Sequence, residues 1–424
     1  MSFDSFASAH SMVLWLAFGI AVVMGAVVNK TNFCTMGAVS DLVNMGDKGR
    51  LRAWIMAMAV ALLGVTFIEA AGILSVDSTR PPYRGSSFAW LEYAVGGILF
   101  GIGMTLGSGC GNKTLIRIGG GNIKSIIVFI VISICAYFMI NPFPGTDDTI
   151  YSMLFYPWTN AATVSLAGSQ DVGSFVSRAI GTDAGSMRLI LGILVGALCL
   201  MFVFKSEEFR QSGDNKLAGL VIGLCVIGAW YVSGAFATIT ADGETHSWVK
   251  FASNDIWSMM AEGKAPSGVA VQSYTFINPI GEMTGYLVNG MSGWKGNTLT
   301  FGMAAALGVI VGSLIWAIIS KGFRIEWFVD MKDFVTHLIG AVLMGIGGVL
   351  ALGCTVGQAI TGASTLAVGS FIAFASIVFG SALTMKIQYY KLVYEEEATF
   401  GKALITSLAD MKLVPNSLRK LDAV

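Results

Sequence analysis

The chain has 424 residues, of which 54% are hydrophobic and only 12% charged, with a mean hydropathy of +0.71. Soluble proteins carry roughly 25% charged residues, so this composition excludes a disordered chain and argues against a soluble enzyme. Lys plus Arg balance Asp plus Glu at 26 each, which gives no indication of a nucleic-acid partner. The 52 glycines favour helices packed closely in lipid, because small residues let membrane helices approach one another.

Nine segments are long and apolar enough to cross a bilayer as helices, which requires about 20 mostly apolar residues. All eight prolines fall between or beyond these segments, where a missing N–H costs little. The sequence therefore predicts an all-α integral membrane protein with about nine transmembrane helices. The predicted spans are residues 12–28, 53–74, 91–106, 123–140, 187–204, 217–236, 299–319, 337–352 and 366–385.

The positions of the basic residues orient these spans. If the N-terminus lies outside, the inner connections hold 19 of the 26 Lys and Arg residues. Because cytoplasmic loops carry an excess of Lys and Arg, we expect a periplasmic N-terminus and a cytoplasmic C-terminus. No Lys or Arg precedes the first apolar run, so no signal peptide is expected.

The predicted organisation has a first membrane repeat, an extracytoplasmic connection, spans five and six, a long extracytoplasmic loop, spans seven to nine and a cytoplasmic tail. Aromatic residues in the long loop, among them Trp248, Trp257, Tyr274 and Phe276, indicate a folded cap or interfacial helices. Interfacial packing alone is the alternative. In the order in which they are named above, the six parts are residues 1–145, 146–186, 187–236, 237–298, 299–385 and 386–424.

A segment rich in glycine and ending in Gly-Cys occurs twice. Gly96 to Cys110 and Gly340 to Cys354 are identical at eight of 15 aligned positions. By the predicted topology, span three runs inward and span eight runs outward. The two copies are therefore inverted, with spans one to four corresponding to spans six to nine. Such inverted repeats with glycine-interrupted segments predict a transporter whose site lies near the membrane midplane, with re-entrant segments near residues 108–122 and 353–365.

The residue types at these breaks suit an anion that contains sulfur. Gly109, Gly111 and Gly353 let a ligand approach backbone N–H groups, which carry partial positive charge at helix N-termini. The thiols of Cys110 and Cys354 add weak, soft donors. Cysteine also binds copper(I) or zinc, but the sequence has no short-spaced cluster of Cys, His or Met. We expect no cofactor and no resident metal.

Other candidates flank these cysteines. Cys34 follows span one in a turn on the inner side. Lys113 and Arg117 can share one face of a short helix after Cys110; each either serves the site or extends to the inner surface.

Neutral donors, Thr355, Gln358 and Thr361, hold the similar place after Cys354. Glu69, late in span two, is either a proton site or a buried hydrogen-bonded carboxyl.

Three cysteine motifs in this order resemble the YeeE/YedE family of sulfur-compound transporters. They are FC-x-x-G at Phe33 to Gly37, Gly109-Cys110, and GC-T-x-G at Gly353 to Gly357. The resemblance implies thiosulfate uptake by a multi-pass protein of the bacterial inner membrane. It also implies that Cys34, Cys110 and Cys354 hydrogen-bond the terminal sulfur of the ion in turn, and that a small cytoplasmic sulfur-carrier protein is the partner.

One departure keeps the substrate open within this class. Other members carry a glutamate in a run like R-x-G-E-G, whereas residues 117–121 here read RIGGG. Another sulfur or selenium oxyanion could bind to the same arrangement of cysteine motifs.

Two functions of other classes also remain. One is a membrane sulfurtransferase or redox enzyme in which Cys110 forms a persulfide and Lys113 lowers the pKa of its thiol. The other is a metal channel.

Overall fold

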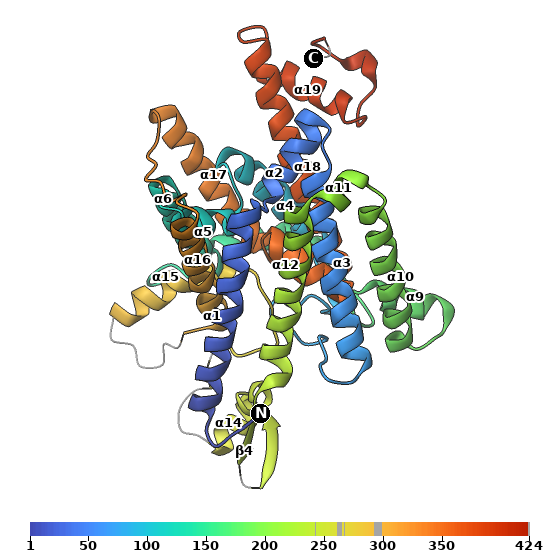
Figure 1. Ribbon diagram of the computed structural model, residues 1–424, viewed down its shortest axis with the longest axis vertical. Coiled ribbons are helices and arrows are strands. Elements are labelled where there is room, and N and C mark those ends of the chain that lie inside the picture. Colours follow the sequence, from blue (N-terminus) through green and yellow to red (C-terminus); the bar gives the residue numbers. More distant parts are fainter. Residues whose placement is uncertain (242, 261–264, 267, 292–298, 423–424) are drawn as a thin grey trace.

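The computed structural model describes residues 1–241, 243–260, 265–266, 268–291 and 299–422 (Figure 1). Within these residues, nine helices are long and apolar enough to cross a membrane. Each predicted span falls on one of them, so the prediction of a helical membrane protein with nine spans is confirmed. The helices are α1 (Phe6–Thr31), α3 (Gly49–Ala70), α4 (Trp90–Leu106), α6 (Ile123–Ile140), α10 (Ala184–Phe204), α12 (Gly213–Tyr231), α16 (Phe301–Ile319), α17 (Met331–Leu350) and α18 (Val368–Val393).

Shorter elements connect these helices. β1 pairs in parallel with β4, β4 pairs antiparallel with β5, and β2 and β3 form a separate antiparallel pair. The strands are β1 (Ser2–Phe3), β2 (Ser87–Phe88), β3 (Val164–Ser165), β4 (Thr238–Ala241) and β5 (Glu244–Ser247). The short helices are α2 (Thr35–Ser40), η1 (Asp41–Met45), α5 (Gly111–Gly119), α7 (Ile150–Leu154), α8 (Tyr156–Ala162), α9 (Val172–Ile180), α11 (Glu207–Gln211), η2 (Val232–Phe236), α13 (Trp248–Phe251), α14 (Asn254–Met260), α15 (Ile277–Met291), η3 (Val356–Gly362), η4 (Ala363–Thr365), α19 (Phe400–Asp410) and η5 (Asn416–Leu418).

The second predicted span runs too far. The hydropathy pattern predicts a span up to residue 74, whereas α3 ends at Ala70. Gly72 adopts a left-handed conformation with φ 68°, and Ile73 donates its N–H to the carbonyl of Ile68, which closes the helix. The apolar residues after this turn belong to a loop, so hydropathy alone overestimates the helix length.

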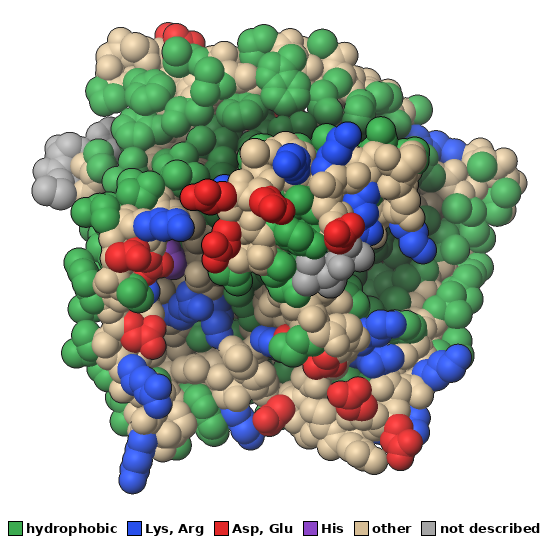
Figure 2. Space-filling model, turned by 90° about the horizontal axis from the view of Figure 1, so that it is seen from above, with side chains coloured by type: hydrophobic (Ala, Val, Ile, Leu, Met, Phe, Trp, Pro, Cys, Tyr) green, Lys and Arg blue, Asp and Glu red, His purple; other side chains and the backbone are tan. Residues whose placement is uncertain are grey.

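The long helices pack in a bundle with its termini at opposite ends. Figure 1 shows the N-terminus beside β4 and α14 at one end, and the C-terminus beside α19 at the other. Seen from the end that carries α19, Lys, Arg, Asp and Glu side chains gather over the middle, and hydrophobic side chains form much of the rim (Figure 2). Apolar side chains of α10 such as Leu194 and Met201 are among the exposed ones. These features fit a bundle whose sides face lipid.

The glycines of the repeated segment form the contact between α4 and α17. A Cβ atom on Gly96 would lie 2.9 Å from the carbonyl oxygen of Gly347. The contact recurs with the two copies exchanged, because a Cβ atom on Gly340 would lie 2.8 Å from the carbonyl oxygen of Gly103. Such reciprocal contacts are those of a twofold-related interface, in which each partner uses the same surface. Only glycine allows backbones this close.

The same reciprocity holds for whole helices. α1 packs on α16 while α3 packs on α12, and α4 packs on α18 while α6 packs on α17. These pairs are the ones expected if the first four spans correspond to the last four. α10, the fifth span, stands outside this correspondence and packs on α3.

Candidate functional site

Cys34, Cys110 and Cys354 each lie at a break between a long helix and a short helical segment. The helices before them are α1, α4 and α17, and the segments after them begin with α2, α5 and η3. Two positions before each cysteine the chain adopts the left-handed conformation, which residues other than glycine rarely adopt. These residues are Asn32 (φ 52°), Ser108 (φ 56°) and Leu352 (φ 56°).

The hydrogen bonds at the three breaks are also the same. In each, the residue before the cysteine donates its N–H to a carbonyl five residues earlier, as in a Schellman turn. The cysteine carbonyl then accepts the first bond of the next helical segment, which leaves that segment's first N–H groups without helical partners. The Schellman bonds are Phe33 to Val28 at 3.2 Å, Gly109 to Met104 at 2.9 Å and Gly353 to Gly348 at 2.8 Å.

The fold brings the three cysteines together in its interior. Cys34, Cys110 and Cys354 are 4%, 2% and 0% exposed. The thiol of Cys110 lies within electrostatic range of the thiols of both Cys34 and Cys354. Cys110 is therefore a neighbour of both other buried thiols.

Backbone donors surround the sulfur of Cys354. The N–H groups of Val356, Gly357 and Phe276 can donate to it, and the hydroxyl of Thr275 lies beside it. The carbonyl of Gly357 accepts a hydrogen bond of 2.8 Å from the hydroxyl of Tyr83, which fixes this turn. Converging N–H groups of this kind attract negative charge without a buried cation.

The three neutral candidates after Cys354 have different surroundings. Thr355 faces the thiol of Cys110 and is fully buried. Gln358 donates through Nε2 to the carbonyl of Ala351 at 2.5 Å. Thr361 donates to the carbonyl of Tyr274 at 2.7 Å, so its hydroxyl holds the structure together and is not free for a ligand.

Buried polar atoms without a hydrogen-bond partner gather around the thiols. Buried polar groups are normally bonded, so each exception needs an explanation such as a missing ligand or water. Thr35 and Asn112 had not been predicted, although each lies within two residues of a site cysteine. Of the thirteen such atoms in the described part of the chain, five belong to residues near the three cysteines: Thr35 Oγ1, Asn112 Oδ1, Thr275 Oγ1, Thr355 Oγ1 and Gln358 Oε1.

The Cys34 side of the site carries positive charge. Lys113 lies within electrostatic range of Cys34, Cys110 and Arg117, and its Nζ donates to Oδ1 of Asn32 at 2.6 Å. Lys113 is thus brought to the site, and Arg117 lies near it.

A further cation on this side, Arg50, had no sequence motif to reveal it. Arg50 forms an ion pair with Asp41 and lies within electrostatic range of Cys34. The positions that match Lys113 and Arg117 after Cys354 hold Gly357 and Thr361, which are uncharged.

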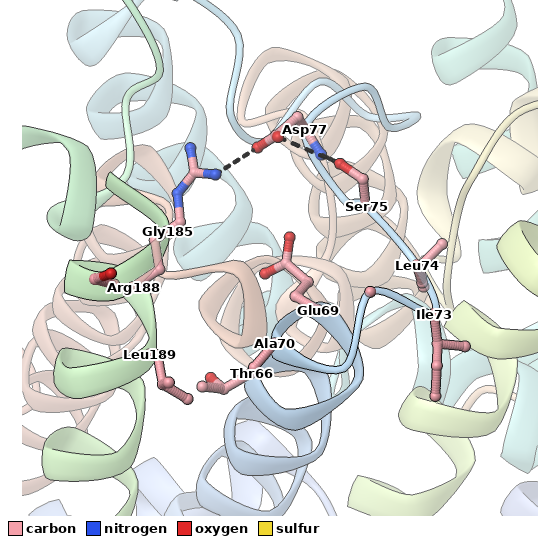
Figure 3. Close-up of a pocket in the computed structure, with 12 residues that line it drawn as sticks. Thr66, Glu69, Ala70, Ile73, Leu74, Ser75, Asp77, Gly185, Arg188 and Leu189 are labelled. Carbon is pink, nitrogen blue, oxygen red and sulfur yellow. Dashed lines mark hydrogen bonds and ion pairs between the residues drawn. The ribbon is translucent and has the colours of Figure 1, made fainter. Parts of the chain in front are cut away.

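Glu69 belongs to a different cluster. It lines a pocket of about 560 Å³ between the end of α3 and the start of α10, together with Asp77 and Arg188 (Figure 3). Its carboxylate accepts hydrogen bonds of 2.7 and 2.8 Å from Arg84. Of the two interpretations of Glu69, the geometry favours the hydrogen-bonded, ion-paired carboxylate.

No group of three or more His, Cys, Asp or Glu residues is placed to hold a metal ion among the residues that the structure describes. The buried thiols are accompanied by neutral donors and by Lys and Arg, which suit an anion.

Comparison with known proteins identifies the family of this chain. The sulphur transport family matches residues 30–383. The thiosulfate transporter TsuA of Spirochaeta thermophila is 22% identical over 381 residues, which cover 87% of this chain and 97% of that protein. The thiosulfate transporter TsuA of Escherichia coli K12 is 23% identical over 358 residues, covering 84% and 89%. The chain belongs to the sulphur transport family and is a multi-pass membrane transporter for sulfur compounds, not an enzyme.

Proposed function

We propose that this transporter imports thiosulfate across the bacterial inner membrane by passing the ion from Cys354 to Cys110 and then to Cys34. The observation that carries the proposal is the convergence of three buried thiols, each next to N–H groups without helical partners at the start of a helical segment. Thiosulfate has a soft terminal sulfur and hard oxygens. Thiols suit the sulfur, and N–H and hydroxyl groups suit the oxygens.

The substrate and the order of the cysteines have independent support. Both relatives described above are named thiosulfate transporters. The central position of Cys110 supports a relay in which it receives the ion from one outer cysteine and delivers it to the other. The excess of Lys and Arg in the predicted inner connections supports a periplasmic N-terminus and a cytoplasmic C-terminus. Cys34 would then lie nearest the cytoplasm.

The relay would run between two inverted repeats. The reciprocal glycine contacts of α4 and α17 and the matching breaks at Cys110 and Cys354 support this arrangement. In it, residues 108–122 and 353–365 enter the membrane from opposite sides as re-entrant segments. Residues 146–186 and most of residues 237–298 would lie on the periplasmic side, with Thr275 and Phe276 reaching inward to Cys354, and the tail at residues 386–424 would lie in the cytoplasm.

A dianion that enters a cell with a negative interior meets an electrical barrier. The barrier is about 2.3 kcal/mol per charge for each 100 mV, and so about 4.6 kcal/mol for thiosulfate. Lys113 and Arg50 near Cys34 would stabilise the ion at the inner end of the relay without changing the net work of entry. Consumption of the ion inside, by a small cytoplasmic sulfur-carrier protein or its enzyme, would supply the drive.

Uptake of labelled thiosulfate tests the relay in cells that lack their own thiosulfate uptake. We expect Cys110→Ala and Cys354→Ala to abolish most uptake, because each removes one sulfur-binding donor from a single series. Cys225→Ala is the matched control, since that buried thiol contacts only the carbonyl of Ile20 at 3.8 Å among the hydrogen bonds described. Full uptake by both site variants at normal expression would exclude the relay.

Serine variants separate hydrogen bonding from covalent sulfur chemistry. Cys110→Ser keeps a donor of similar size, so it should retain more uptake than Cys110→Ala if the thiol only hydrogen-bonds the ion. Equal loss in both, with a persulfide on Cys110 detected by mass spectrometry, would replace the relay by a sulfur-transfer step.

A further inference from the structure

We propose that Thr275 is a substrate-binding residue whose hydroxyl binds an oxygen of the anion while Cys354 binds its terminal sulfur. The inference rests on the thiosulfate relay proposed above and deepens it. It assigns a residue that recognises the oxygen end of the ion, for which the cysteines are poorly suited. Thr275 lies in the long connection between α12 and α16, outside all three cysteine motifs.

The hydroxyl of Thr275 is buried, free and directed at the site. Thr275 is 6% exposed, and its Oγ1 has no hydrogen-bond partner. It lies beside the thiol of Cys354. A Cβ atom on Gly357 would lie 2.4 Å from Oγ1 and one on Gly353 would lie 3.4 Å from it. The hydroxyl therefore packs directly against the Cys354 segment, and a side chain at residue 357 would displace it.

Neighbouring residues hold Thr275 in place. The carbonyl of Tyr274 accepts the hydrogen bond from Thr361, and the hydroxyl of Tyr274 donates to the carbonyl of Ala17 at 2.8 Å. The ring of Tyr274 stacks on Phe301 with centroids 5.9 Å apart. Because both the backbone and the adjacent side chain are fixed, the free hydroxyl is positioned before a ligand arrives, which lowers the cost of binding.

The place of Thr275 in the fold matches that of Cys34. Cys34 leads into α2, which packs on α3 and α18, and Thr275 leads into α15, which packs on α16 and α6. If spans one to four match spans six to nine, α3 corresponds to α16 and α18 corresponds to α6. Thr275 thus accompanies Cys354 as Cys34 accompanies Cys110, with a hydroxyl in place of a thiol.

The chemistry of the Cys354 side requires such a donor. The positions that match Lys113 and Arg117 are the uncharged Gly357 and Thr361, and the hydroxyl of Thr361 is already bonded. The donors around the sulfur of Cys354 are therefore backbone N–H groups and the hydroxyl of Thr275, whereas the hydroxyl of Thr355 faces Cys110. An O–H group is a stronger donor to an oxygen than an S–H group is. Together with the thiol, it distinguishes the two ends of the ion.

Two variants of nearly unchanged shape test the inference in the full-length protein. Thr275→Val removes the hydroxyl and keeps the volume, whereas Thr275→Ser keeps the hydroxyl. Ser407→Ala is the matched control, because it removes an equally buried, unpartnered hydroxyl in α19, far along the chain. The measurements are initial uptake rates over a range of thiosulfate concentrations, and the rise in the melting temperature of the purified protein when thiosulfate is added.

We expect Thr275→Val to raise the half-saturating thiosulfate concentration about tenfold, the usual effect of losing a hydrogen bond to a charged ligand. The maximal rate should change less, and about ten times more thiosulfate should be needed for the same rise in melting temperature. Thr275→Ser and Ser407→Ala should match the natural protein within about twofold.

Each other result overturns a defined claim. Unchanged half-saturation in Thr275→Val, with uptake abolished in Cys354→Ala, overturns the role of Thr275 and leaves the relay intact. Equal impairment of Thr275→Ser and Thr275→Val means that Thr275 only packs, which also overturns its role. Absence of thiosulfate uptake and of thermal stabilisation in the natural protein overturns both proposals.

Discussion

A buried hydroxyl or amide oxygen without a partner costs roughly 1–3 kcal/mol. Around its three thiols this chain keeps several such atoms, among them those of Thr35, Asn112 and Thr355. In the proposed relay a passing anion would supply the missing partners while it is bound. Each site would then bind the ion through few groups, so the ion could also leave.

Charge near Cys34 should matter for transport. We expect Lys113→Gln to lower thiosulfate uptake roughly tenfold, because it removes the ammonium group near Cys34 and Cys110. Lys113→Arg should retain most of the activity. The control is Lys391→Gln, an exposed lysine in the last turn of α18. Normal uptake in Lys113→Gln would show that the side chain only extends towards the membrane surface.

The site could be predicted from sequence only where its residues fall in motifs. Cys110 and Cys354 stand out because a 15-residue segment repeats, and Cys34 because it belongs to a third motif. Thr275 and Arg50 carry no such signal. They reach the thiols through the packing of distant segments, which no local spacing encodes.

At the scale of elements, hydropathy predicts the long helices well and the breaks between them poorly. Nine spans follow from apolar length, because a lipid-facing helix must satisfy its backbone internally. The left-handed turns at Ser108 and Leu352 do not follow from composition, since neither residue type favours that conformation. They are held by Schellman bonds and by the close contact of α4 with α17. The Gly-Cys pairs therefore indicated that a break exists, but not its geometry.

The contact of α4 with α17 gives a test at this scale. In Gly103→Ala the new Cβ atom would lie 2.6 Å from the carbonyl oxygen of Gly340 and 2.8 Å from the backbone nitrogen of Met344. The helices would have to separate, so we expect a loss of about 1–3 kcal/mol and a clearly lower melting temperature in detergent. Gly19→Ala in α1 is the control, because its Cβ atom meets nothing within 4 Å. It should be neutral or stabilising by up to about 1 kcal/mol. Equal melting temperatures for the two variants would contradict the close contact.

At the scale of the whole molecule, a cluster of ion pairs connects α3 and the end of the Cys354 segment to α10. Arg84 bonds to Glu69 of α3 and donates to the carbonyl of Thr365, at the end of the Cys354 segment. Arg188 of α10 bonds to both Asp77 and Asp171. Desolvation opposes ionisation of Asp171, but the bonds from Arg188 and nearby serines outweigh it and hold its pKa well below the usual range.

Because folding lowers the pKa of Asp171, the contribution of this carboxyl to stability is present in a defined pH range. A carboxyl whose pKa is lowered on folding stabilises the protein at every pH above its unfolded value of about 3.9, and this contribution is lost only as the pH falls further. We therefore expect the melting temperature of the natural protein to show no loss from Asp171 between pH 7 and pH 5. A marked fall of melting temperature in that range, absent from Asp171→Asn, would contradict the lowered pKa.

The pair of Glu69 and Arg84 gives the strongest test of the cluster. The side chain of Arg84 is 1% exposed and that of Glu69 18% exposed, so removal of Arg84 leaves Glu69 without its cation, and removal of Glu69 leaves the buried Arg84 only its 3.1 Å contact with Asp77. We expect Glu69→Gln and Arg84→Gln each to lower stability by about 3–5 kcal/mol, and the double variant to lose clearly less than the sum. Melting temperatures at pH 7 measure this, and losses that simply add would contradict it. Because Arg84 also holds Thr365, Arg84→Gln should impair thiosulfate uptake more than Glu69→Gln does at temperatures where both remain folded. That difference would show that the cluster positions the Cys354 segment as well as stabilising the fold.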